Sequence, residues 1–221
     1  MIDLAIEYSH LLAEGLERTL VIGVASFTLG FAVSMALSFA RFMGPQPLRA
    51  FAEAYIAFIR GTPLLVQLLM LYFGLPSVGV RLDALTAAIL AIGLNSGAYQ
   101  AEIIRSTVKA VPEEEVLVGK SLGLSDGQVL RYVILPQAVR NAIPALTNEF
   151  VTLLKESALA SVIGVMELTR VGEFMTSATF RALESYVLVA LIYLAVSYAF
   201  MGASRGAERM LAIPGFERWS R

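Results

Sequence analysis

Residues 19–40 read TLVIGVASFTLGFAVSMALSFA, a stretch of 22 residues without a charge that lies between Arg18 and Arg41. A helix rises about 1.5 Å per residue, so this stretch is long enough to cross the roughly 30 Å of hydrocarbon in a bilayer. The composition agrees, because 57% of the 221 residues are hydrophobic and 16% are charged, against roughly 45–50% and about 25% in soluble domains. The chain is therefore predicted to be an all-α membrane protein.

Four further apolar segments are predicted to span the membrane: residues 61–80, 84–101, 137–154 and 185–204. The third of these four has the weakest apolar signal, because it contains Asn141, Asn148 and Glu149. The prediction is one transmembrane domain of five spans that covers residues 1–221.

The distribution of Lys and Arg predicts the orientation, because these residues accumulate on the cytoplasmic side. The loops and ends on one side of the predicted spans hold 12 of the 17 basic residues when Arg140, in the first turn of the fourth span, is counted with the loop before it, and those on the other side hold 5. The N-terminus is therefore expected outside and the C-terminus inside. Residues 1–17 have no Lys or Arg and an amphipathic pattern, so we expect an interfacial segment and not a signal peptide. Phe216 and Trp219 suggest an interfacial anchor at the other end.

Several classes of site are excluded by composition. The chain has no cysteine and one histidine, His10, which excludes disulfides, thiolate metal sites and a histidine cluster. A net charge of −1 gives no general attraction to nucleic acid. We expect no catalytic, cofactor-binding or metal-binding residues.

The longest predicted cytoplasmic segment, about residues 112–136, carries the clearest local pattern. Pro112 and the three glutamates after it favour a helix start. Gly123 is expected to end that helix, and Ser125 or Asp126 to cap a second helix that leads into the fourth span. Such a projecting helix suits docking into a groove on a soluble partner, although the spacing alone also fits an ordinary amphipathic loop.

Residues 119–121, Gly-Lys-Ser, match the end of a phosphate-binding P-loop. That motif requires a glycine five positions before the second one, and Glu114 stands there. Nucleotide binding by this chain is therefore not expected.

Four ordered motifs resemble the permease subunits of ATP-binding cassette (ABC) importers for polar amino acids, of the histidine, glutamine, glutamate, arginine and opine types. The family's cytoplasmic signature is Glu-Ala-Ala, three residues, Gly, nine residues and Ile-x-Leu-Pro. Gly123 takes the place of its glycine, and Val-Ile-Leu-Pro at 133–136 completes it. The other three are RGTPLLVQ at 60–67, NSGAY at 95–99 with Glu102, and LLKES at 153–157 with SVIGV at 161–165.

This resemblance implies a translocation subunit of a prokaryotic cytoplasmic membrane that performs no bond chemistry and needs no cofactor. Its expected partners are a second permease copy or paralogue, a dimer of ABC ATPase subunits that uses ATP, an extracytoplasmic amino-acid-binding protein, the amino acid and membrane lipid. The residues expected to couple it to the ATPase are Glu115, Leu117, Gly119, Gly123, Leu124, Ser125, Leu135 and Pro136.

One departure from the family signature matters for coupling. Without a gap, the Glu-Ala-Ala triplet falls on Leu117, Val118 and Gly119, so its acidic residue is missing. The glutamates at 113–115 lie two to four residues earlier. Either these acids substitute for the missing one, or the partner permease supplies the stronger contact with the ATPase.

Polar residues within the spans predict the substrate path, because such residues usually face a bundle interior. Asn95, Tyr99 and Glu102 share one helix face through their i, i+4, i+7 spacing. The fourth span and its end supply a second set: Asn148, Glu149, Thr152, Lys155, Glu156 and Ser157. Together they offer donors and acceptors for an amino-acid zwitterion, and the two glutamates favour a cationic one. The alternative is that they only join helices.

The sequence argues against two other functions. A stand-alone secondary transporter or channel for a small polar solute usually carries repeated halves, and the five unequal spans show no repeat. A membrane-embedded enzyme would need paired aspartates, a Ser–His pair or metal ligands at membrane depth. Asp3, Asp83 and Asp126 all lie outside the predicted spans.

Overall fold

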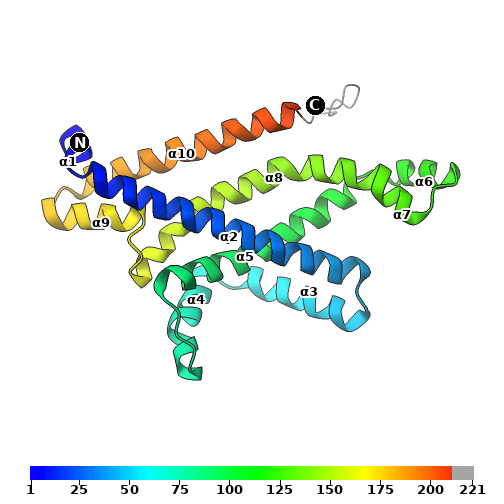
Figure 1. The fold of residues 1–221 in the computed structure, drawn as a ribbon, viewed down its shortest axis with the longest axis horizontal. Helices are drawn as coiled ribbons and strands as arrows, with labels where there is room; N and C mark the ends of the chain where they lie inside the picture. The colour runs from blue at the N-terminus through cyan, green and yellow to red at the C-terminus, as the bar shows by residue number, and fades with distance from the viewer. Residues whose placement is uncertain (211–221) are drawn as a thin grey trace.

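The computed structural model describes residues 1–210, and every regular element in that range is helical (Figure 1). In chain order these elements are α1 (Ile2–Glu7), α2 (Ser9–Met43), α3 (Gln46–Gly61), α4 (Leu64–Leu69), the π-helical turn η1 (Met70–Gly74), the 3₁₀ turn η2 (Leu75–Val78), α5 (Ala84–Lys109), α6 (Glu113–Ser121), α7 (Asp126–Val129), the π-helical turn η3 (Leu130–Ile134), α8 (Leu135–Glu156), the 3₁₀ turn η4 (Ser157–Ile163), α9 (Leu168–Thr179) and α10 (Ala182–Met210). The predicted anchor at Phe216 and Trp219 lies outside the described residues.

The centre of the bundle is a close crossing of α2 and α5, and glycine makes it possible. A Cβ on Gly97 would lie 2.6 Å from Val33 Cγ1, and one on Gly93 would lie 2.7 Å from Leu29 Cδ2. A Cβ on Gly30 would lie 3.1 Å from the carbonyl oxygen of Gly93. Small residues allow this approach where no hydrophobic force drives helices together in lipid. The crossing therefore fixes how α2 and α5 pack.

Four of the five predicted spans fall inside single helices: residues 19–40 in α2, 84–101 in α5, 137–154 in α8 and 185–204 in α10. The predicted span at 61–80 is different. The chain bends by 106° between Gln46–Gly61 and Leu64–Val78. Thr62 is extended (φ −123°, ψ 146°), as expected for the residue before a proline. The apolar segment is thus broken at Pro63, and it begins earlier, in α3.

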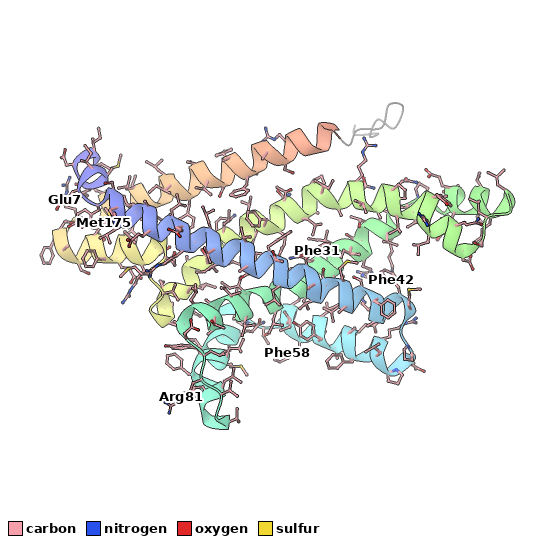
Figure 2. All side chains as sticks on the ribbon, in the orientation of Figure 1. Glu7, Phe31, Phe42, Phe58, Arg81 and Met175 are labelled. Atoms are coloured by element: carbon pink, nitrogen blue, oxygen red, sulfur yellow. The ribbon has the colours of Figure 1, made fainter. Side chains whose placement is uncertain are left out.

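By length and apolar composition, two of the described helices can cross a membrane alone, Ser9–Met43 and residues 182–206 of α10. The bent pair would make a third if it forms one span. Large apolar side chains point outward from the bundle, among them Phe31 and Phe42 on α2 and Phe58 on α3 (Figure 2). These three are 43%, 47% and 57% exposed. An apolar outer surface of this kind fits lipid or a partner chain.

A cluster of buried apolar residues lies at the end of the molecule that holds the N-terminus (Figure 1). Leu4, Leu168, Val171 and Met175 are buried together between α1, α2, α9 and α10. The carboxylate of Glu167 caps α9 by accepting from the backbone N–H groups of Thr169 and Arg170. This arrangement places α9 against the beginning of α2, far from α6.

Candidate coupling segment and transport path

The segment predicted to dock on a partner projects from the bundle at the end opposite the N-terminus (Figure 1). It contains α6, a reversal at Gly123, α7 and η3, and it leads into α8. Gly123 has φ +81°, a left-handed conformation that ends helices and that favours glycine. Its N–H donates to the carbonyl of Lys120, and the N–H of Leu124 donates to that of Gly119. The predicted helix, glycine break and second helix are confirmed.

The restart after Gly123 is also as predicted. Ser125 and Gln128 form a reciprocal capping box, in which each side chain accepts from the backbone N–H of the other. Lys120 pairs with Asp126 over 2.9 Å, which ties α6 to α7 across the reversal. Capping of this kind stabilises a short helix that could not form alone. The reversal is thus held by local interactions from both sides.

The candidate coupling residues fall into two groups by exposure. Leu117, Gly123, Ser125, Leu135 and Pro136 are exposed, whereas Gly119 is buried and Glu115 and Leu124 are half-buried. Leu117, Val118 and Leu122 are 62%, 59% and 77% exposed. Exposed apolar side chains on a projecting helix indicate a docking surface.

On α5, the three predicted path residues have different surroundings. Asn95 is buried and donates to Gln67 Oε1 on α4 over 3.0 Å. Tyr99 is exposed, and the guanidinium carbon of Arg60 lies 5.3 Å from its ring centroid. Glu102 accepts hydrogen bonds from Arg41 on α2 and from Arg105, and Arg60 Nη1 lies 3.7 Å from its carboxylate. The three residues therefore lie on one face of α5, but three arginines surround the carboxylate of Glu102.

On α8, the predicted path residues separate into an inner and an outer stripe. Glu149, Thr152 and Glu156 are partly buried, whereas Asn148 and Lys155 are exposed. Ser157, the first residue of η4, is buried and donates to the carbonyl of Leu154. The structure thus offers an amide and an ammonium on the outer stripe of α8.

Three polar side chains that join helices were not among the predicted path residues. Ser96 donates to Glu149 Oε1 over 2.7 Å, and Gln100 Nε2 donates to Ser96 Oγ over 2.9 Å. Gln67 bonds to Asn95 and also to the carbonyl of Ile59, across the break at Pro63. The sequence holds a signal for each of them. Ser96 and Gln100 directly follow the predicted path residues Asn95 and Tyr99, and Gln67 is the one polar residue of α4.

Comparison with known proteins agrees with this architecture. Residues 29–209 match the family model described as binding-protein-dependent transport system inner membrane component. The chain is 40% identical over 205 residues to the glutamine transport system permease protein of Escherichia coli (strain K12), which covers 92% of this chain and 94% of that protein. It is 37% identical over 199 residues to the arginine transport system permease protein of Bacillus subtilis (strain 168), with 90% and 91% covered.

Solved structures give the same result. The crystal structure of an amino acid ABC transporter with histidines is 40% identical, has a TM-score of 0.89 and covers 93% of this chain and 96% of that one. A methionine ABC transporter in an inward-facing conformation has a TM-score of 0.76 at 21% identity, over 94% and 99% of the two chains. The second likeness supports the fold alone. The resemblance found in the sequence motifs is confirmed.

Proposed function

Because this chain belongs to the family of binding-protein-dependent transport system inner membrane components, we propose that it is the translocation subunit of an ATP-driven importer for polar amino acids. It crosses the cytoplasmic membrane of a prokaryote five times, with its N-terminus outside and its C-terminus inside. A second permease copy or paralogue completes the pathway, and an extracytoplasmic binding protein delivers the amino acid. The chain itself carries no cofactor, since ATP is used by the partner.

One observation carries the proposal most directly. The segment from α6 to η3 projects from the bundle and exposes Leu117, Val118 and Leu122 to solvent. Leaving such side chains in contact with water costs roughly 25 cal/mol for each Å² of uncovered apolar surface. An ABC ATPase dimer that receives α6 in a groove would cover them. Closure of that dimer on ATP would then move α6, and the coupling would be mechanical.

The substrate class is supported by the relatives and by the outer stripe of α8. Relatives named for glutamine and arginine transport share 40% and 37% identity with this chain. Asn148 and Lys155 present donors and one positive charge to the surroundings of α8. An amino-acid carboxylate is the group that such a set binds. The half-buried Glu149 and Glu156 favour a cationic side chain.

The ATPase assignment is tested by placing a charge on the docking surface. Leu117→Asp should abolish co-purification of the ATPase subunits and substrate-stimulated ATP hydrolysis. Leu183→Asp is the matched control, because Leu183 is 78% exposed at the start of α10, at the opposite end of the molecule. Retention of the ATPase and of transport by Leu117→Asp would contradict the docking surface.

The substrate is tested separately, by measuring binding of the common amino acids to the cognate extracytoplasmic protein. Binding of at least one polar amino acid is expected. Failure of every amino acid to bind would overturn the substrate class and leave the transport role intact.

A further inference from the structure

The helix α6 has an inner and an outer face, and Glu115 lies on the inner one. Glu115 and Gly119 are four residues apart, so they share a face of the helix. That face packs inward, because Gly119 is buried and a Cβ on it would lie 3.4 Å from Val129 Cγ2 and 3.5 Å from Val133 Cγ2. Leu117 and Val118 point to solvent instead. Glu115 therefore does not belong to the docking surface.

The carboxylate of Glu115 is bound to α8. Gln137 Nε2 donates to Glu115 Oε2 over 2.5 Å and to the carbonyl of Val133 over 3.1 Å. Over residues 1–210, this is the only hydrogen bond or ion pair between side chains of α6 and α8. The Lys120–Asp126 pair holds α6 to α7 and does not reach α8. Glu113 and Glu114, in contrast, are exposed on the first turn of α6.

The backbone route from α6 to α8 passes through an irregular turn. It runs around the reversal at Gly123, through the four residues of α7 and then through the π-helical turn η3. The π-helical turns are rare and are found mostly as local bulges in helices, frequently at functional sites. Pro136, at the start of α8, also lacks a backbone N–H for the helix ladder. The hydrogen bond between Glu115 and Gln137 connects the two helices directly and bypasses this turn.

The connection matters because α8 carries the outer stripe. Gln137 precedes Asn148 by 11 residues on the same helix, which is about 16 Å at 1.5 Å per residue. Pro144 lies between them and removes one hydrogen bond of the helix ladder, but α8 is continuous from Leu135 to Glu156. A link at Gln137 would therefore carry motion of α6 along α8 to Asn148 and Lys155.

We propose that Glu115 and Gln137 form a brace that makes α6 and the first turn of α8 move as one unit during transport. Glu115 is then a positioning residue for coupling, turned away from the ATPase, and not a substitute for the acid missing from the family signature. The inference rests on the proposed function, in which the ATPase docks on α6. It deepens that function by naming the side chains that pass the movement on.

The test uses the full assembly of permease, ATPase and binding protein in proteoliposomes, with amino acid transported per ATP hydrolysed as the measurement. Glu115→Ala and Gln137→Ala each remove the brace and should lower this ratio about tenfold, the factor expected for one hydrogen bond to a charged group. The ATPase should still co-purify with both. Glu115→Gln retains an oxygen that accepts from Gln137, and it should keep the ratio within about twofold.

Two further variants make the result specific. The exchange Glu115→Gln with Gln137→Glu reverses donor and acceptor and should restore the ratio that either alanine variant loses. Glu53→Ala removes an exposed acid from α3, outside the docking segment, and should leave the ratio unchanged. Rescue by the exchange would not follow from a general loss of stability.

Three outcomes would overturn the brace. One is an unchanged transport ratio in both alanine variants with the ATPase bound. Another is loss of ATPase co-purification in Glu115→Ala but not in Gln137→Ala, which would make Glu115 an ATPase contact. The third is an exchange variant no better than the alanine variants. Failure of the wild-type chain to bind any ATPase would instead remove the proposed function, and the brace with it.

Discussion

Ser96 on α5 donates a hydrogen bond of 2.7 Å to a carboxylate oxygen of Glu149 on α8, within the apolar part of the bundle. Ser96 accepts at the same time from Gln100, whose Nε2 also donates to the carbonyl of Phe27 on α2. The Ser96 hydroxyl and the Gln100 amide together thus connect three helices. The network is satisfied in part, since the buried amide oxygen of Gln100 has no hydrogen-bond partner within the described residues.

Ser96→Ala should therefore loosen the contact between α5 and α8. Measured hydrogen bonds between membrane helices average about 0.6 kcal/mol and reach about 1.7 kcal/mol, and we expect a loss of stability in that range. The measurement is the unfolding of the detergent-solubilised assembly. Ser106→Ala is the control, because Ser106 is exposed and bonds within its own helix to the carbonyl of Ile103. Equal losses in the two variants would contradict the role of Ser96.

Gly97→Ala should push α2 away from α5. The added methyl would lie 2.6 Å from Val33 Cγ1 and 3.3 Å from the carbonyl oxygen of Gly30, and overpacking typically costs about 1–3 kcal/mol. Thermal unfolding of the purified chain measures the effect. Gly202→Ala serves as the control, because nothing lies within 4 Å of a Cβ at that position of α10. A Gly97→Ala protein as stable as this control would show that the crossing can widen freely.

Gly123 should tolerate asparagine better than valine. Its φ of +81° is unfavourable for a side chain, although no atom lies within 4 Å of a Cβ there. The penalty is therefore conformational, about 1–2 kcal/mol for most residues and less for asparagine. We expect Gly123→Val to lose substrate-stimulated ATP hydrolysis and Gly123→Asn to keep most of it. Normal coupling in the valine variant would contradict the role of the reversal.

Glu167 should make the stability of the chain depend on pH. Burial raises the pKa of the Glu167 carboxyl, although hydrogen bonds from Thr169 and Arg170 act in the other direction. A raised pKa means that the folded chain holds this proton to higher pH than the unfolded one, whose pKa is about 4.3. Stability should thus fall as pH rises from the unfolded value through the raised folded value.

This pH dependence is checked by following the unfolding temperature over that window in the wild type and in Glu167→Gln. The glutamine variant stays uncharged at every pH, so its unfolding temperature should fall less as pH rises. It also loses one of two acceptor oxygens, which should lower its stability at all pH values. Parallel curves for the two proteins would exclude Glu167 as the titrating group.

Features that depend on neighbouring residues in the chain could be predicted from the sequence. Pro112, Gly123 and Ser125 fix the start, reversal and restart of the projecting segment through local backbone preferences. The predicted spans at 19–40, 84–101, 137–154 and 185–204 likewise lie within single helices. The stretch at 61–80 does not, because a count of apolar residues does not register the loss of helix at Thr62 and Pro63.

The partners of the polar residues could not be predicted in the same way. Helical spacing correctly placed Asn95 and Glu102 on one face, but Gln67, Arg41 and Arg60 reach them from other helices. Nothing in the local sequence distinguishes Ser96 from a serine that serves helix packing. Its importance depends on Glu149, which is 53 positions away in the chain. Contacts of this range follow from the packing of α5 against α2 and α8.

The glycine crossing between α2 and α5 has a consequence for how the chain can move. Neither helix can slide or roll past the other without driving Val33 or Leu29 into the opposite backbone. The two helices are therefore expected to keep their positions relative to each other when other parts of the subunit move. Irregular backbone lies elsewhere, at the Pro63 bend between α3 and α4 and at the π-helical turn between α7 and α8. A conformational change that keeps the crossing intact would therefore bend the chain at these two places.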